Sequence, residues 1–381
     1  MKVRKNKLVS LAALGLVGGL ALTACGGGAA EDTSGNAGSD NGGAAASGGY
    51  AELTGNLAGS GASSMQNAQN AWTESFMGLV GAEGGDIQVT YDATGSGTGR
   101  EQFLAGQVKF AGTDAALDEE ELAASAEQCN GEQAFNLPVY ISPIAVVFKL
   151  DGVEELNLSP EVIGGIFAET ITNWNDPAIA ELNPDATLPD LAIVPVHRSD
   201  DSGTTENFTE YLSDNAPDAW THGPIETWPI DGGQSGDGTS GLISAVEGGN
   251  GTIGYADASQ AGNLGTAAIQ VGEEFVPFSS DAAAKSVDVS PREEGRAEND
   301  IVVDLDRTTA EEGVYPIVLI SYLALCGSYA DSAEGEAVKA YASYVISEDG
   351  QAVGEQNAGS APISEELRTE AQAAIDGITV G

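Results

Sequence analysis

The sequence predicts an α/β fold, because strand-like and helix-like runs alternate from about residue 53 to the C-terminal end. The expected strands are short, rich in apolar residues and cover 86–93, 143–150, 191–198, 251–257 and 315–326. Apolar residues recur at helical spacing over 334–347 and 364–375. This alternation is typical of strands that pack against the helices joining them.

A second observation is a recurring unit in which a loop rich in Gly, Ser and Thr leads into a helix-like run. The three units read LAGSGASSMQNAQNAWTESF, YDATGSGTGREQFLAG and HRSDDSGTTENFTEYL. Their expected buried faces are, in order, Ala68, Trp72, Phe76 and Leu79; Phe103 and Leu104; and Phe208, Tyr211 and Leu212. Each loop ends in Ser or Thr where a helix N-cap is expected, and GDGTSGLISAVE at 236–247 is a fourth candidate.

The first 25 residues have the pattern of a targeting segment, not of a folded domain. A basic start, MKVRKNK, precedes an apolar run that is slightly short for a membrane span. The run ends in LTAC, which resembles the bacterial lipobox and implies a lipoprotein signal peptide over 1–24 with lipid attached to Cys25. An ordinary secretory signal with an incidental cysteine is the alternative. Residues 25–52 are rich in Gly, Ala and Ser and are expected to form a flexible linker.

The charge of the chain excludes several classes of partner. The 381 residues include 14 Lys and Arg against 58 Asp and Glu, a formal charge of −44. All the acids lie beyond residue 25, whereas four of the basic residues precede it, so residues 26–381 carry −48. Such a surface excludes nucleic acid as a partner and favours a strongly solvated exterior. Hydrophobic residues make up 41% of the chain, which is enough for a core.

The cysteines predict one disulfide bond. Once Cys25 is set aside, Cys129 and Cys326 remain, and an exported chain with two cysteines most simply pairs them. Two buried thiols are the alternative. The two cysteines lie far apart in the sequence with no histidine nearby, so they do not have the spacing of a metal site.

The Gly/Ser/Thr loops point to an anion. A helix N-terminus leaves about four N–H groups without partners and carries roughly half a positive charge. Three such loops in one chain favour an anion site if the fold brings them together. Arg198 is the natural counter-charge, since a guanidinium can bind two oxygens of an oxyanion. The alternatives are an ordinary helix cap and a surface ion pair of Arg198 with Asp200 or Asp201.

Other chemistry has little support in the sequence. There is no Walker A motif, no G-x-G-x-x-G before a helix and no G-x-S-x-G. His197 and His222 are the only histidines and have no metal-ligand spacing. We therefore expect no enzyme activity, catalytic residue, cofactor or metal.

Taken in order, the loops resemble those of the periplasmic phosphate-binding proteins of the phosphate ABC transporter. GSGASS, GSGTG followed by VKFAGTDAAL, and RSDDSGTTENF match that family's three ligand loops, and weaker matches such as IGYAD extend over 53–376. The resemblance implies phosphate-binding groups at Ser63, Ser64, Ser96, Asp114, Arg198, Ser202, Gly203 and Thr204. It also implies that Asp200 orients Arg198.

The same resemblance implies the architecture and the partners. The family has a two-lobed type II fold of the Venus-flytrap kind, with two hinge crossings. Here it implies one lobe from 53–139 plus 256–381 and another from 140–255, with crossings near 138–142 and 254–257. The two paired cysteines then fall in one lobe. The implied partners are inorganic phosphate and the permease subunits, with a monomer held by lipid at the extracytoplasmic face of the cell membrane.

Asp114 is the implied site residue whose role in ligand selectivity can be explained by simple chemistry. A carboxylate beside an anion is repulsive unless the ligand carries a proton that it can donate to the carboxylate. Hydrogenphosphate has that proton and sulfate at neutral pH lacks it, so Asp114 is expected to reject sulfate. The alternative for Asp114 itself is a cap or turn. Other readings of the chain are a binder of sulfate or molybdate, an exported phosphatase, and an adhesion or signalling protein that keeps the fold without binding.

Four positions depart from the family pattern. Ser63 replaces Thr and keeps the hydroxyl, Ser64 replaces Phe, and Thr98 stands where a small residue is usual. Asp201 stands where the family usually has Gly, and its effect on the site is left open.

Overall fold

A computed structural model of the chain describes residues 49–381. The predicted signal peptide, Cys25 and the linker up to residue 48 lie outside the described residues. Residues Tyr50–Glu52 form a single 3-10 turn, η1, at the start of the described part. No helix in this part is long and apolar enough to cross a membrane.

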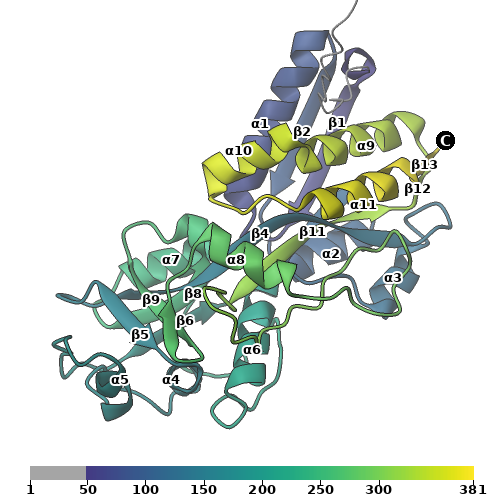
Figure 1. Ribbon diagram of the computed structural model, residues 1–381. Helices are drawn as coiled ribbons and strands as arrows, with labels where there is room; N and C mark the ends of the chain where they lie inside the picture. Colours follow the sequence, from purple (N-terminus) through teal and green to yellow (C-terminus); the bar gives the residue numbers. More distant parts are fainter. Residues whose placement is uncertain (1–48) are drawn as a thin grey trace, which may run out of the picture. The chain divides into compact units, whose positions relative to one another are not determined.

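The fold is α/β, as predicted, and is built on one large, curled mixed sheet (Figure 1). Its main path runs β2-β1-β3-β11-β4-β8-β6-β7, and β9 joins β4 while also pairing with β5 and β10. The strands are β1 Thr54–Gly61, β2 Asp86–Asp92, β3 Phe110–Thr113, β4 Ala134–Lys149, β5 Glu155–Leu158, β6 Val194–Arg198, β7 Gln234–Gly236, β8 Thr252–Asp257, β9 Gly265–Val271, β10 Glu274–Val276 and β11 Val318–Cys326. A separate parallel pair consists of β12 Ser328–Tyr329 and β13 Thr379–Val380.

Helices cover the sheet at both ends. Figure 1 shows α1, α9 and α10 beside β1 and β2, and α4, α5 and α7 beside β5, β6 and β8. The helices are α1 Gln66–Glu83, α2 Ser96–Leu104, α3 Glu119–Ser125, α4 Pro160–Phe167, α5 Pro177–Leu182, α6 Gly203–Asn215, α7 Gly238–Glu247, α8 Ser280–Asp288, α9 Ser332–Ile346, α10 Glu348–Ala358 and α11 Glu365–Asp376, with a 3-10 turn, η2, at Ala258–Gln260.

Strand β4 connects the two ends of the sheet. Fifteen of its sixteen residues are buried. Its first part pairs with β11 as far as Pro143, and its second part, from Ile144, pairs with β8. A strand was predicted only over 143–150, with a hinge crossing placed near 138–142. Pro138 has no N–H to donate to a ladder. Pro138 is accommodated because the β4–β11 register shifts there.

Strands β9 and β10 lie on the second part of the sheet. β9 pairs with β5 over Glu155–Leu158 and with the β4 residues Val147 and Phe148. Residues 265–276 were expected in the lobe that contains 53–139, but their pairing joins them to strands from 140–255.

The predicted helix faces are largely buried. Ala68, Trp72 and Phe76 of α1 are fully buried, whereas the prediction for Leu79 is wrong, since its side chain is 44% exposed. Val80 is buried instead. The chain that follows α1 packs against Val80, because a Cβ on Gly85 would lie 2.6 Å from the Val80 side chain.

The second and third helix faces are also buried, with one exception. Phe103 of α2 and Phe208, Tyr211 and Leu212 of α6 are fully buried. Leu104 is only partly buried.

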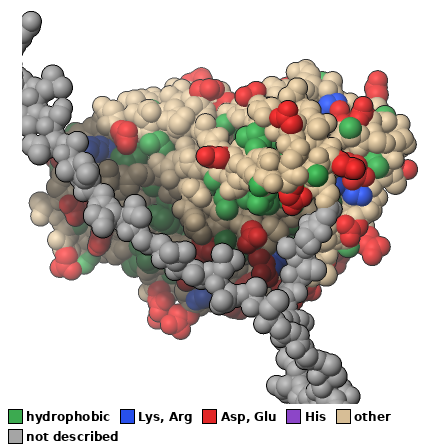
Figure 2. Space-filling model, turned by 90° about the horizontal axis from the view of Figure 1, so that it is seen from above, with side chains coloured by type: hydrophobic (Ala, Val, Ile, Leu, Met, Phe, Trp, Pro, Cys, Tyr) green, Lys and Arg blue, Asp and Glu red, His purple; other side chains and the backbone are tan. Residues whose placement is uncertain are grey.

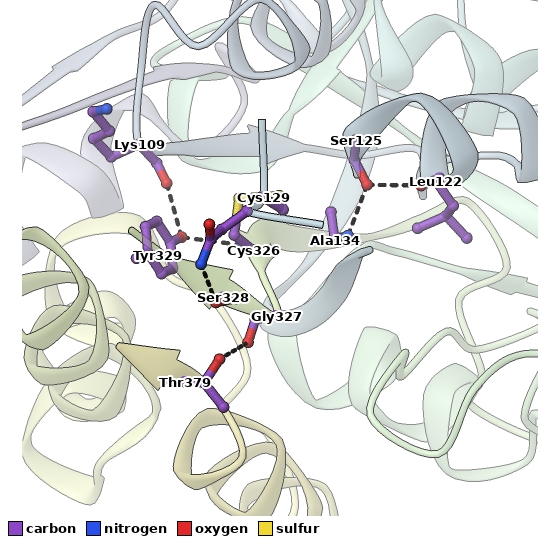
Figure 3. The surroundings of a disulfide bond; sticks show 11 residues. Lys109, Leu122, Ser125, Cys129, Ala134, Cys326, Gly327, Ser328, Tyr329 and Thr379 are labelled. Atoms are coloured by element: carbon purple, nitrogen blue, oxygen red, sulfur yellow. Dashed lines mark hydrogen bonds between the residues drawn. A yellow bond between two sulfur atoms is a disulfide. The ribbon is translucent and has the colours of Figure 1, made fainter. Parts of the chain in front are cut away.

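Cys129 and Cys326 form a disulfide, which confirms the predicted pairing. Figure 3 shows the bond beside Tyr329, whose hydroxyl donates to Lys109 O and accepts from the N–H of Cys326. The bond closes a loop with a sequence separation of 197 residues. In the chain-entropy model a loop of this size stabilises the folded state by about 5 kcal/mol.

The surface carries the acidity that the composition predicts. The face in Figure 2 shows many red Asp and Glu side chains and few blue Lys and Arg. Several of the basic residues are instead buried, among them Arg100, Arg198 and Arg307. Those arginines therefore pair inside the protein and do not balance the surface charge.

Candidate functional site

The predicted site residues come together where the first turns of α1, α2 and α6 face the end of β3. Ser63, Ser64, Ser96, Asp114, Arg198, Ser202 and Thr204 are between 0% and 4% exposed, and Gly203 is also buried. They come from four segments of the chain that are far apart in sequence. The link is direct, because Ser64 and Thr204 both contact Asp114.

Asp114 is the centre of the cluster. Oδ1 of its carboxylate accepts from the hydroxyls of Ser64 and Ser321, both at 2.7 Å, and Oδ2 accepts from Thr204 Oγ1 at 2.8 Å. Burial raises the pKa of Asp114 above its ordinary value. The three hydroxyls and the charge of Arg198 counteract part of that rise. These contacts replace the cap-or-turn alternative, since the carboxylate binds hydroxyls from three distant segments.

Backbone contacts also hold Asp114 in place. Its N–H donates to Ser96 Oγ at 3.1 Å, and its carbonyl accepts from Asn207 Nδ2 at 2.8 Å. Asn207 lies one turn into α6 and also binds the carbonyl of Gly203. The end of β3 is thus tied to both α2 and α6.

Arg198 and Asp200 form a buried, two-point ion pair. Nε of Arg198 donates to Oδ1 at 2.7 Å, and Nη2 contacts Oδ2. Gly238 N at the start of α7 donates to the same Oδ1 at 3.0 Å. Burial alone raises the pKa of Asp200, but the hydrogen bonds and charge of Arg198 and the Gly238 N–H outweigh it, so the net shift is downward. Because Arg198 is 3% exposed, a surface ion pair does not describe it.

Asp201, the departure from the family pattern, lies outside the cluster. It is exposed, and its carboxylate accepts from Thr227 Oγ1 at 2.5 Å. Its backbone carbonyl accepts from Gly97 N at 3.3 Å. Asp201 therefore packs at the edge of the α2 loop and does not pair with Arg198.

The N-cap prediction is right for one loop of three. Ser202 caps α6, because its Oγ accepts from Thr205 N at 3.1 Å. The caps of α1 and α2 are Met65 and Gly95, and neither makes a side-chain cap bond. The hydroxyls of Ser64 and Ser96 bind Asp114 instead, so these serines face the cluster and not their own helix.

Several backbone donors at these loops remain without a protein partner. Within residues 49–381, the N–H groups of Ser63, Ser64, Ser96, Gly203 and Thr204 donate to no protein acceptor. All five belong to the predicted site. Ser202 differs, because its N–H donates to Glu226 O at 3.3 Å. Arg198 Nη1 likewise donates to no acceptor in this part of the chain.

Gly203 is required by the close approach of the segments. A Cβ at this position would lie 2.7 Å from Ser96 Oγ and 2.9 Å from Asp114 Cβ. Any larger residue would push α6 away from α2 and β3. The glycine therefore allows the two predicted ligand loops to face each other at contact distance.

Three contacting residues were not predicted as site residues. Thr239, in the fourth candidate loop, donates its N–H to Ser63 Oγ at 2.9 Å. Ser321 on β11 binds Asp114, and Asn207 binds the Asp114 backbone. Thr239 could have been found from the sequence, because it lies in the fourth candidate Gly/Ser/Thr loop. Ser321 could not, because it lies inside an apolar run with no motif around it.

Arg100 forms a second buried ion pair beside the cluster. Its Nη1 and Nη2 donate to the two carboxylate oxygens of Glu226, each at 2.9 Å, and its Nε donates to Glu121 at 2.9 Å. Nη1 also donates to Thr113 Oγ1 at 3.1 Å, one residue before Asp114. Since Glu226 O accepts from Ser202 N, this pair connects α2 to the loop that begins α6.

The described residues contain no group of His, Cys, Asp and Glu side chains arranged to hold a metal ion. His197 stacks on Trp228 and contacts two backbone carbonyl oxygens, Arg198 O and Gly232 O. What the cluster offers is a counter-charge, one carboxylate and several unpaired N–H donors. That set can bind an oxyanion that carries a proton.

Comparison with known proteins decides the family. Residues 36–349 match the model of the PBP superfamily domain. The phosphate-binding protein PstS 3 of Mycobacterium tuberculosis is 34% identical, over 96% of this chain and 98% of its own length. PstS 2 of the same organism is 33% identical, over 99% of both chains. This chain belongs to the PstS family of phosphate-binding proteins within the PBP superfamily.

The fold of this PstS family member is also shared with a solved structure. The high-affinity periplasmic phosphate-binding protein PfluDING, solved with phosphate bound, aligns with a TM-score of 0.67. The alignment covers 84% of this chain and 93% of that chain at 21% identity. At that identity the likeness supports the fold alone, and it confirms the predicted periplasmic-binding-protein class.

Proposed function

We propose that this protein captures inorganic phosphate between two lobes and delivers it to the permease of an ABC importer. The observation that carries the proposal is the meeting of Arg198, Asp114 and five unpaired backbone N–H groups in one buried cluster. Together they match a protonated oxyanion in charge and in hydrogen-bond direction. Membership of the PstS family supports phosphate as that anion.

In the proposed complex each segment has a distinct role. The N–H groups of Ser63, Ser64, Ser96, Gly203 and Thr204 donate to phosphate oxygens, and the positive ends of α1, α2 and α6 favour the negative charge. Arg198 contributes Nη1 while Asp200 holds the rest of its guanidinium. Ser202 contributes its hydroxyl hydrogen, since its oxygen caps α6. Asp114 accepts the proton of the ligand.

We assign the residues to the two proposed lobes by the pairing of their strands. We place 53–139 plus 256–381 in the first lobe and 140–255 in the second, except that we move 265–276 to the second because β9 pairs with β5. Strand β4 is then one of the crossings, because its two parts pair with β11 and β8. Phosphate bound by Ser64 on one lobe and Thr204 on the other favours the closed form, because only that form makes both sets of contacts.

The proposal includes the location. We propose a monomer anchored by lipid on Cys25 at the extracytoplasmic face of the cell membrane, with no enzymatic role. Intact mass spectrometry of the protein extracted from membranes tests this part. A mass that includes diacylglyceryl and acyl groups on a chain starting at residue 25 supports it, and an unmodified chain contradicts it.

Calorimetry with phosphate, arsenate and sulfate tests the function. We expect tight binding of phosphate and arsenate and rejection of sulfate. Asp114→Asn should relax the rejection of sulfate, because an amide can donate to an unprotonated oxygen. Absence of phosphate binding overturns the proposal. If sulfate or molybdate binds more tightly than phosphate, that anion is the ligand of the protein. Turnover of a phosphomonoester that a change in the cluster abolishes would instead indicate a hydrolase.

A further inference from the structure

Ser321 reaches Asp114 because of the register between β11 and β3. The antiparallel pairs are Ala324 with Ala111, Leu323 with Gly112 and Tyr322 with Thr113. The next position along both strands sets Ser321 opposite Asp114. The β4–β11 register shifts between Ser321 and Tyr322, where β4 has one extra residue, Val139. The result is a fully buried hydroxyl 2.7 Å from Oδ1.

The hydrogen bonds around Asp114 can be counted. An ionised carboxylate offers about four lone-pair positions, two on each oxygen. Ser64 and Ser321 occupy both positions on Oδ1, and Thr204 occupies one on Oδ2. One position on Oδ2 therefore remains for a further donor. A ligand with one O–H group directed at Asp114 completes the set.

Few charged or titratable groups act on Asp114. Arg198 from β6 counteracts part of the rise that burial causes in the pKa of Asp114. Burial, followed by the charge of Asp114, raises the pKa of the Tyr91 phenol on β2. Tyr91 donates its hydroxyl to Ala62 O, not to the carboxylate. Arg100 from α2 binds the neighbouring Thr113. The other groups in contact are the neutral hydroxyls of Ser64, Thr204 and Ser321.

We infer that Ser321 is a specificity-determining positioning residue, which with Ser64 fills Oδ1 so that Asp114 stays ionised and presents a single acceptor on Oδ2. A donor on Oδ1 stabilises the charged carboxylate, and burial opposes that charge. Without the Ser321 hydroxyl, Asp114 takes up a proton at a higher pH. A protonated Asp114 donates to an anion, so the site then accepts sulfate as readily as it accepts phosphate.

The direct test is a titration of the Asp114 carboxyl carbon by ¹³C NMR in the ligand-free full chain. Ser321→Ala should raise the midpoint by about one pH unit, which is the size expected for one hydrogen bond to a charged group. Ser286→Ala is the matched control, because Ser286 on α8 is equally buried and its hydroxyl has no partner within residues 49–381. An unshifted midpoint in folded Ser321→Ala overturns the inference.

A conservative variant separates hydrogen bonding from packing. Ser321→Thr keeps the hydroxyl and should titrate with the wild-type midpoint. A shift as large as that of Ser321→Ala would assign the effect to packing and overturn the inference. Circular dichroism and the thermal midpoint of each variant establish that it is folded.

The selectivity test rests on the proposed phosphate function, whereas the titration does not. Sulfate does not change charge between pH 5 and 8, so its affinity over that range reports the protein alone. Ser321→Ala should begin to bind sulfate about one pH unit above wild type, and Ser286→Ala should follow wild type. If wild type binds no phosphate, the proposed function fails while the Asp114 titration still decides the role of Ser321. Phosphate binding with identical sulfate profiles for Ser321→Ala and wild type overturns the inference alone.

Discussion

Arg198 and Arg100 are both buried arginines with a two-point contact to a carboxylate, yet they are organised differently. The partner of Arg198 is two residues away in the same loop, and Nη1 remains without a protein acceptor in the described part of the chain. The partner of Arg100 is 126 residues away, and all three of its guanidinium nitrogens donate to Glu121, Thr113 or Glu226. A local pair leaves a donor for a ligand, whereas a distant pair holds two segments together.

The largest expected effect is on ligand binding by Arg198. Arg198→Met should weaken phosphate binding by at least about a thousandfold, equivalent to about 4 kcal/mol, because it removes the counter-charge and leaves Asp200 and Asp114 to repel the anion. Calorimetry measures the affinity, and circular dichroism establishes that the variant is folded. A loss of less than tenfold would contradict the role of Arg198 as the counter-charge.

The second effect separates Arg100 from Arg198. Glu226→Gln leaves the buried Arg100 without its two-point partner and should lower the free energy of unfolding by about 3 kcal/mol. Urea unfolding measures this change. Phosphate affinity should fall by no more than about tenfold, since the guanidinium of Arg100 is directed at Glu121, Thr113 and Glu226 and not at the predicted ligand loops. If Glu226→Gln instead matches Arg198→Met in binding, the distinction between the two arginines is wrong.

The carboxylates around Arg100 predict a dependence on pH. Burial, followed by the charge of Glu226, raises the pKa of Glu206 to about 7. The folded state then holds a proton that the unfolded state releases near pH 4.5, so stability falls as the pH rises from about 4.5 to 7. Glu206→Gln should remove on the order of 1–2 kcal/mol of this fall. Urea unfolding at pH 5 and pH 8 checks it, and an unchanged difference between the two pH values would count against it.

The smallest effect is expected at an exposed pair. Arg368 contacts Glu348, whose side chain is 83% exposed. Arg368→Met should change the free energy of unfolding by less than about 0.5 kcal/mol and leave phosphate affinity unchanged, because solvent screens the pair. It serves as the control for the other arginine changes. A larger effect would mean that burial does not decide what these pairs contribute.

The sequence predicted the part of this molecule that is local. The Gly/Ser/Thr loops, the Arg198–Asp200 pair and the Ser202 cap each depend on residues within a few positions of one another. Ser321 was not predicted, because its place opposite Asp114 follows from the register of β3 and β11, which are about 200 residues apart. Glu226 was missed for the same reason, since nothing near it in the sequence points to Arg100.

Two local predictions were wrong because contacts with residues outside the helix decided the hydrogen bonds of the serines and the burial of the helix face. A Ser or Thr was expected to cap the helix after each loop, but in the first two loops the hydroxyls of Ser64 and Ser96 bind the carboxylate and the N–H of Asp114. Leu79 was expected in the core by helical spacing, but the chain that follows α1 covers Val80 instead. Helical periodicity and capping rules describe one helix at a time, so they do not show which neighbour covers it.

The Cys129–Cys326 bond determines what a single proteolytic cut does to this protein. All of the chain from 130 to 325, including the Arg198 loop and most of the large sheet, lies inside one covalent ring. A protease that cuts one surface loop within the ring produces two pieces that remain a single molecule. Such a nicked protein runs at full size on a non-reducing gel and separates into fragments only when a reductant opens the ring.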